Sequence, residues 1–116
     1  MHMAWNRYGN KYRNKKIETA DGVFDSKKEF NRWCELRMLE RTGAIQHLYR
    51  QVPFELIPTQ YIDGKCVERS CKYIADFVYE EHGKTVVEDA KGFRTADYNI
   101  KRKLMLHVHG IRVKEI

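Results

Sequence analysis

Charged residues interrupt both apolar runs of the segment YIADFVYEEHGKTVVEDAKG, residues 73–92. The first run contains Asp76, and the second contains Asp89 and Lys91. A symmetric turn at His82-Gly83 predicts a β-hairpin whose register places Asp76 directly opposite Asp89. Opposed residues have Cβ atoms about 5 Å apart, and like charges at that separation are destabilising. We therefore expect a cation to bind between the two carboxylates.

Strand alternation decides which acid of the second run takes part. With a period of two, Asp89 and Lys91 project from one face, whereas Glu88 projects from the other. Two carboxylates at this separation form a hard oxygen site suited to Mg²⁺, which binds through one or two carboxylates and keeps water ligands. Such a site can activate a water and stabilise charge on a phosphate, with the Lys91 ammonium nearby. A surface ion pair between Asp89 and Lys91 is the alternative.

A third carboxylate comes from a predicted helix in FDSKKEFNRWCELRMLERTG, residues 24–43. Ser26 or the preceding aspartate can cap its start, and Gly43 is a stop signal at its end. At 100° per residue, Glu29 lies on the same stripe as Trp33 and Leu36, which faces the core. Glu29 either completes the metal site or acts only as the capping-box partner of Ser26, and the local sequence leaves both open.

The remaining patterns predict four further segments. QVPFELIP, residues 51–58, alternates like a half-buried strand, and TQYIDGKCVERSCK, residues 59–72, has the mixed charge of a loop with a turn at Asp63-Gly64. TADYNIKRKLMLHVHG, residues 95–110, has helical spacing, with Thr95 or Asp97 as a possible cap and Gly110 as the stop. IRVKEI, residues 111–116, closes the chain as a strand.

The order of these elements predicts an α/β fold in a single αβββαβ domain. The last helix can connect the hairpin to a parallel strand of the same sheet. We expect a mixed sheet of four strands flanked by two helices, spanning residues 17–116 after a basic arm over residues 1–16. A chain of 116 residues has room for one such core.

The charge distribution favours a polyanionic partner. The net charge is +6, and two basic clusters stand out: the arm of residues 1–16, and Lys101 with its two neighbours. Phosphate contacts release counterions, so such clusters favour nucleic acid. No membrane span or apolar leader is recognisable, so we expect a cytoplasmic protein that makes no membrane contact, with its three cysteines reduced.

Asp76 followed by Asp89-Ala90-Lys91 resembles the signature of the PD-(D/E)xK nuclease superfamily, and SKKE at residues 26–29 is similar to its helical glutamate motif. The stretches FDSKKEF, LYRQVPFEL, YIADFVY, VVEDAKGFRT and IKRKL resemble a family of small phage-encoded nucleases of the Holliday-junction resolvase type. The resemblance spans roughly residues 8–116. Ala75 stands where the superfamily name has proline.

The resemblance implies a restriction-endonuclease-like fold and a Mg²⁺-dependent endonuclease, with Mn²⁺ able to substitute. The enzyme would hydrolyse phosphodiester bonds in DNA with a metal-activated water and leave a 5′-phosphate. Asp76 and Asp89 would hold the metal, Glu29 would complete or support its shell, and Lys91 would position the water. The resemblance further implies four substrate-binding residues, namely Gln51, Arg94, Lys101 and Arg102.

The resemblance also implies a DNA substrate and a second copy of the chain as partners. A branched or four-way DNA junction is the expected substrate, and symmetric cutting implies a homodimer in which the basic arm and first helix can exchange between protomers. Two alternatives remain open. One is a nuclease of the same core that nicks, repairs or packages DNA without junction selectivity. The other is a basic DNA-binding module that does no chemistry.

Overall fold

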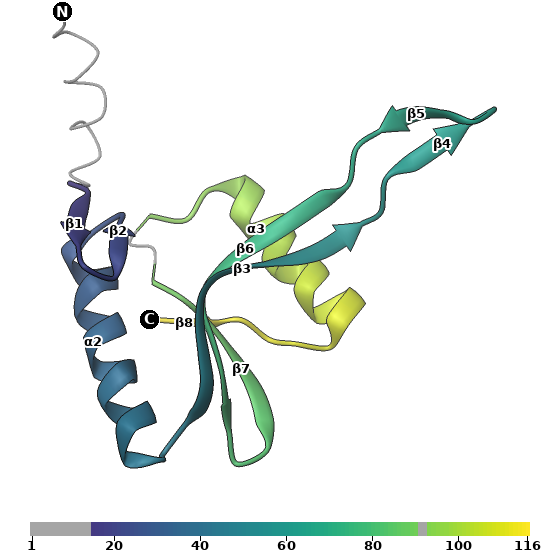
Figure 1. Cartoon of the computed structure of the whole chain (residues 1–116). Helices are drawn as coiled ribbons and strands as arrows, with labels where there is room; N and C mark the ends of the chain where they lie inside the picture. Colours follow the sequence, from purple (N-terminus) through teal and green to yellow (C-terminus); the bar gives the residue numbers. More distant parts are fainter. Residues whose placement is uncertain (1–14, 91–92) are drawn as a thin grey trace, which may run out of the picture.

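A mixed four-stranded sheet with the order β3-β6-β7-β8 forms the centre of the protein in the computed structural model, which describes residues 15–90 and 93–116 (Figure 1). Two small two-stranded sheets, β1-β2 and β4-β5, accompany it. The elements in chain order are β1 (Ile17–Thr19), β2 (Gly22–Phe24), α2 (Lys27–Thr42), β3 (Gln46–Ile57), β4 (Gln60–Ile62), β5 (Lys65–Glu68), β6 (Cys71–Glu81), β7 (Lys84–Asp89), α3 (Ala96–Leu104), η1 (Met105–His109) and β8 (Lys114–Glu115).

The sheet has the predicted mixed pairing. β3, β6 and β7 pair antiparallel, and β8 pairs parallel to β7 at the far edge. Pro53 occurs within β3, which is an edge strand, the kind of strand in which a proline without an N–H is tolerated. The prediction of an α/β domain with four sheet strands and two flanking helices is confirmed.

Both helices begin at the predicted caps. Ser26 caps α2 by accepting a hydrogen bond from the Glu29 N–H, and Gly43 ends it in the left-handed conformation. Thr95, rather than Asp97, caps α3. The second helix continues through the π-helical stretch η1 to Gly110, which is again left-handed. Within the described residues, no helix combines the length and apolar composition needed to cross a membrane.

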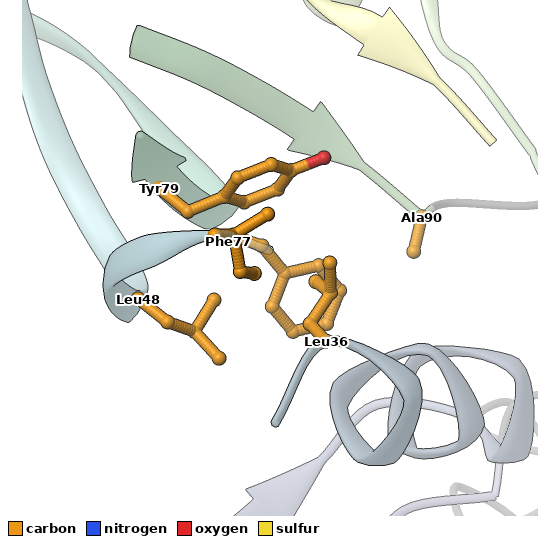
Figure 2. Packing of buried hydrophobic residues seen from close by; sticks show 6 residues of the cluster. Leu36, Leu48, Phe77, Tyr79 and Ala90 are labelled. Atoms are coloured by element: carbon orange, nitrogen blue, oxygen red, sulfur yellow. The ribbon is translucent and has the colours of Figure 1, made fainter. Parts of the chain in front are cut away.

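The two faces of the sheet carry separate hydrophobic clusters. The α2-side cluster packs strand residues against Leu36 of the helix (Figure 2), and its buried members are Leu36, Ile45, Leu48, Phe77, Tyr79 and Ala90. The α3-side cluster is closed by Met105 of η1, and its buried members are Leu56, Tyr73, Ala75, Val87, Met105 and Val113. The candidate strand acids, Asp76 and Asp89, belong to β6 and β7, which contribute residues to both clusters or adjoin them.

The loop predicted for residues 59–72 is wrong, because most of it forms a β-hairpin arm. β4 and β5 pair antiparallel around Asp63 and Gly64, whose φ values of 52° and 78° match the predicted turn. Figure 1 shows the arm projecting from the ends of β3 and β6. Every residue of β4 and β5 is exposed, so the segment lacks the alternation by which a half-buried strand is recognised.

The ends of the domain also differ from prediction. The hairpin of β1 and β2 precedes α2 and was not predicted, and β8 covers only two residues of the predicted strand 111–116. The described chain contains residues 15 and 16 of the predicted basic arm, while residues 1–14 lie outside it.

Because the arm of β4 and β5 contributes nothing to either cluster, its removal should leave the domain folded. We predict that replacing residues 58–70 by Asn-Gly, which joins the paired residues Ile57 and Cys71 through a tight turn, changes the free energy of unfolding by less than about 1 kcal/mol. Urea denaturation measures this. A loss of cooperative unfolding would show that the arm belongs to the core.

Candidate active site

The β6–β7 hairpin has the predicted register. Phe77 pairs with Glu88, and the pairs continue to Glu81 and Lys84 next to the turn. Asp76 is the residue before this series, and its Oδ2 accepts a hydrogen bond of 2.8 Å from the N–H of Ala90. Since Ala90 directly follows Asp89, the Asp76 carboxylate lies beside the end of β7.

Asp89 is held by groups from three directions. Its Oδ2 accepts a 2.9 Å hydrogen bond from the Tyr73 hydroxyl, and its Oδ1 lies 3.8 Å from Nη2 of Arg94. The Arg94 Nη2 and the N–H of Ile116 donate to the Asp89 carbonyl oxygen. Burial and the neighbouring Asp89 charge raise the pKa of Tyr73, so this phenol stays a hydrogen-bond donor. Asp89 is therefore a fixed carboxylate, only 1 % exposed.

Glu29 is both a helix-cap residue and a part of the acidic site. Its Oε1 accepts a 3.3 Å hydrogen bond from the Asp25 N–H, which is a cap contact. Its Oε2 accepts a 3.2 Å hydrogen bond from Nε2 of Gln51, and the same Nε2 lies 3.4 Å from Oδ1 of Asp76. One amide thus joins the carboxylate of α2 to that of β6. Ser26 thus caps the backbone N–H of Glu29 as predicted, while the Glu29 carboxylate returns to the N–H of Asp25 instead of that of Ser26, and its role as a metal ligand stays a prediction.

Arg50 also belongs to this site, and no sequence pattern predicted it. Its guanidinium lies 3.7 Å from the Phe24 ring centroid and 3.8 Å from Oε2 of Glu29. Its Nη2 donates to the carbonyl oxygen of Val23 in β2. The unpredicted β1–β2 hairpin is thereby attached to the acidic site. No local signal distinguishes Arg50, because its partners are distant in the sequence.

Glu88 faces away from the site, as strand alternation predicted. Its carboxylate receives two hydrogen bonds from Arg32 of α2, at 2.9 and 2.7 Å, and one from the Tyr79 hydroxyl. Burial alone raises the pKa of Glu88, but the hydrogen bonds from Arg32 and Tyr79 outweigh it, and the pKa lies below its ordinary value. Glu88 is thus a structural acid on the α2 side.

β3 changes the faces of its side chains at Gln51. Leu48 packs in the α2-side cluster, whereas Leu56, also even-numbered, packs in the α3-side cluster. Gln51 lies between them with φ of 53°, a left-handed conformation that non-glycine residues rarely adopt. A left-handed residue inside a strand interrupts alternation, which explains the change of face.

β6 changes face at the same level. Ala75 packs in the α3-side cluster and Phe77 in the α2-side cluster, although they are two residues apart. Strict alternation would place Ile74 and Val78 on the face of Asp76; instead, Val78 packs against the α3-side cluster and Ile74 is 46 % exposed. Asp76 is therefore the residue at which the odd-numbered side chains of β6 change from the α3-side cluster to the α2-side cluster.

The predicted substrate-binding residues have internal contacts. Arg94 contacts Asp89 and Glu115, Arg102 contacts Glu115 at 3.2 Å, and Lys101 lies 3.9 Å from Asp97. Gln51 lies between Glu29 and Asp76, as described above. Lys91, the predicted catalytic lysine, lies outside the described residues.

The carboxylates fit a metal ion as a pair of ligands with water. Among the residues that the structure describes, no group of three or more acidic, histidine or cysteine side chains is arranged to hold an ion together. Mg²⁺ binds proteins through one or two carboxylates, and a carboxylate oxygen carries two lone pairs, so the donor types of Asp76 and Asp89 suit this ion. Glu29 is connected to this pair through Gln51, whose amide contacts both Glu29 and Asp76.

The chain belongs to DUF1064, a family of proteins of unknown function whose model matches residues 9–114. No significant match was found among curated proteins or solved structures.

The Arg32–Glu88 pair predicts a pH-dependent stability. Because the pKa of Glu88 is lowered from 4.5 by folding, the pair stabilises the protein above that pH, and this stability is lost as the pH falls through the folded pKa. We predict that Glu88→Gln lowers the free energy of unfolding by about 3 kcal/mol at pH 7, and that the deficit shrinks in acid.

Urea denaturation across acidic and neutral pH measures this difference. The control is Glu35→Gln, which removes the 66 % exposed partner of the same arginine and should cost below about 0.5 kcal/mol. Equal losses in the two variants would contradict a structural role of the buried pair.

Proposed function

We propose that this protein is a metal-dependent DNA endonuclease with a restriction-endonuclease-like fold of the PD-(D/E)xK superfamily. The observation that carries the proposal is the burial of Asp76 and Asp89, each 1 % exposed, where β6 and β7 adjoin. Burying adjacent carboxylates costs several kcal/mol, which a bound cation offsets. The link from Asp76 through Gln51 to Glu29 supports the same reading, because it brings the helical acid to the strand acid.

The carboxylates and Lys91 would have different tasks. Asp76 and Asp89 would bind Mg²⁺, with Mn²⁺ as a substitute, and Glu29 would support them through Gln51. When bound, the ion supplies Lewis acidity that activates a water and neutralises phosphate charge. The ammonium of Lys91 would orient that water or stabilise the charge developing on the phosphate. Tyr73 and Arg94 would keep the Asp89 carboxylate in position.

We propose a branched DNA, with a four-way junction preferred, as the substrate. Two cuts placed symmetrically on a junction require two active sites, so the proposed active form is a homodimer. The net charge of +6 supports a polyanionic substrate. Comparing cleavage of a junction with cleavage of its linear arms tests the preference, and equal rates would leave a nuclease without junction selectivity.

The central prediction concerns Asp89. Asp89→Asn keeps the shape of the side chain and its contact with Tyr73 but removes the charge that binds the ion. We predict that it lowers Mg²⁺-dependent cleavage at least 100-fold, while the dissociation constant for DNA changes only a few fold. Lys91→Ala should behave alike. Gel-based cleavage and fluorescence anisotropy measure the two quantities.

The adjacent acid provides the control. Glu88→Gln removes a buried charge from the other face, so its cleavage rate per folded molecule should stay within a few fold of wild type. The wild-type protein is incubated with a four-way junction, a nicked duplex and a flap in the presence of Mg²⁺ or Mn²⁺. If all three DNAs stay intact with both ions, the proposed nuclease function is wrong.

A second pair of variants separates the two roles of Glu29. Glu29→Gln removes the charge but leaves a residue that can still cap the helix, so we predict a loss of cleavage of at least tenfold with little loss of stability. Ser26→Ala removes the cap and keeps the charge, so it should cost about 1 kcal/mol and spare cleavage. The reverse pattern would make Glu29 a cap residue only.

A further inference from the structure

Two clefts meet at the edge strand β8. One has a volume of about 660 Å³, lies between the start of α2 and β8, and is lined by Lys27, Lys28, Asn31, Arg32, Glu35, Lys114 and Ile116. The other, of about 720 Å³, lies between the second helix and β8 and is lined by Arg102, Lys103, Leu106, Arg112, Val113, Lys114 and Glu115. Lys114 lines both clefts, so the two adjoin at this residue.

Five exposed cations of these clefts form no ion pair within the described part of the chain. They come from three separate segments and are Lys27, Lys28, Lys103, Arg112 and Lys114, here called the basic edge. The other charged groups in the clefts have partners: Arg32 pairs with Glu88 and Glu35, and Glu115 pairs with Arg102. The unpaired charge of both clefts is therefore positive.

Lys27 and Lys28 occupy positions that are unfavourable for the helix. They are the first two residues of α2, where the positive end of the helix dipole and the free N–H groups favour anions. Two lysines there cost stability instead of adding it. A ligand that carries negative charge would remove this cost, because it neutralises both ammonium groups and the dipole.

Lys114 has a structural explanation of its own, since lysine on an edge strand discourages pairing with other chains. That explanation does not extend to the lysines of α2 or to Arg112 and Lys103, which are not in a strand. The convergence of all five on two adjoining clefts is what calls for a polyanion longer than a single phosphate.

The basic edge adjoins the acidic site through the backbone of β8. Glu115 pairs with Asp89, and Ile116, which lines the first cleft, donates its N–H to the Asp89 carbonyl oxygen. The backbone of β8, which carries Lys114, therefore lies next to the end of β7 at Asp89.

We propose that the basic edge binds the sugar–phosphate backbone of duplex DNA next to the phosphate that is cut. This inference rests on the proposed function. The backbone crosses Lys114, with the lysines at the start of α2 on one side and Lys103 and Arg112 on the other. These contacts are independent of base sequence.

The experiment compares two triple variants of the full chain. The edge triple is Lys27→Gln, Lys28→Gln and Lys114→Gln, and the control triple is Lys65→Gln, Lys72→Gln and Lys84→Gln, which removes the same charge from exposed lysines outside both clefts. Fluorescence anisotropy measures affinity for a labelled duplex in EDTA, where no cutting occurs, over a series of salt concentrations. Thermal unfolding checks that each variant is folded.

We expect the edge triple to bind the duplex at least tenfold more weakly, with a slope of log affinity against log salt that is less negative by about 2 to 3, roughly 0.9 per lost phosphate contact. The control triple should keep the wild-type slope. The edge triple should also unfold at the same or a higher temperature, because the repulsion at the start of α2 is gone.

Equal slopes for the two triples would overturn the proposal, and so would an edge triple that loses affinity for heparin but not for DNA. The two proposals can fail separately. If the wild-type protein cuts no DNA with Mg²⁺ and the edge triple still loses DNA binding, the proposed nuclease function is wrong and the proposed DNA binding by the basic edge is supported. Wild type that cuts DNA, while the edge triple binds it normally, refutes the basic edge alone.

Discussion

The burial of acidic side chains is the constraint on which the arrangement of the domain depends. Four are buried in the described part of the chain: Glu29, Asp76, Glu88 and Asp89. A buried charge costs several kcal/mol unless other groups compensate it. The compensating arginines come from three different places, Arg32 from α2, Arg50 from β3 and Arg94 from the segment before α3. Neutralising the acids therefore fixes both helices against the sheet, so the fold and the candidate site are stabilised by the same contacts.

The left-handed conformation of Gln51 costs free energy, but it also shapes the candidate site. A non-glycine residue in this conformation costs about 1 kcal/mol or more and persists only where its surroundings hold it. Here the conformation changes the face of β3, and the side chain places one amide between Glu29 and Asp76. Strain of this kind concentrates at functional sites. The change of face also lets each half of β3 and β6 pack against a different helix, which leaves Asp76 at the boundary between the two clusters.

The features predicted correctly from the sequence are those set by neighbouring residues. The His82-Gly83 turn determines the register that runs from the pair Glu81 and Lys84 to the pair Phe77 and Glu88, and the cap residues determine both helix starts. The β4–β5 arm was missed because a hairpin exposed on both faces has no alternation of polar and apolar residues. The change of face at Gln51 and the position of Arg50 were missed because they depend on groups far away in the sequence.

The proposed nuclease has to bring a polyanion to a cluster of carboxylates that repels it. Arginine and lysine side chains occupy different places, which reduces this repulsion. Arginine, a planar donor that loses hydration readily, is the residue that reaches the buried acids, as Arg32 does with two hydrogen bonds to Glu88. Lysine, a strongly hydrated point charge, predominates on the exposed basic edge, where it can attract phosphates without committing to an internal partner. In the proposed nuclease, the unpaired lysines of the basic edge would hold the DNA backbone while a divalent cation lies between the carboxylates and the phosphate.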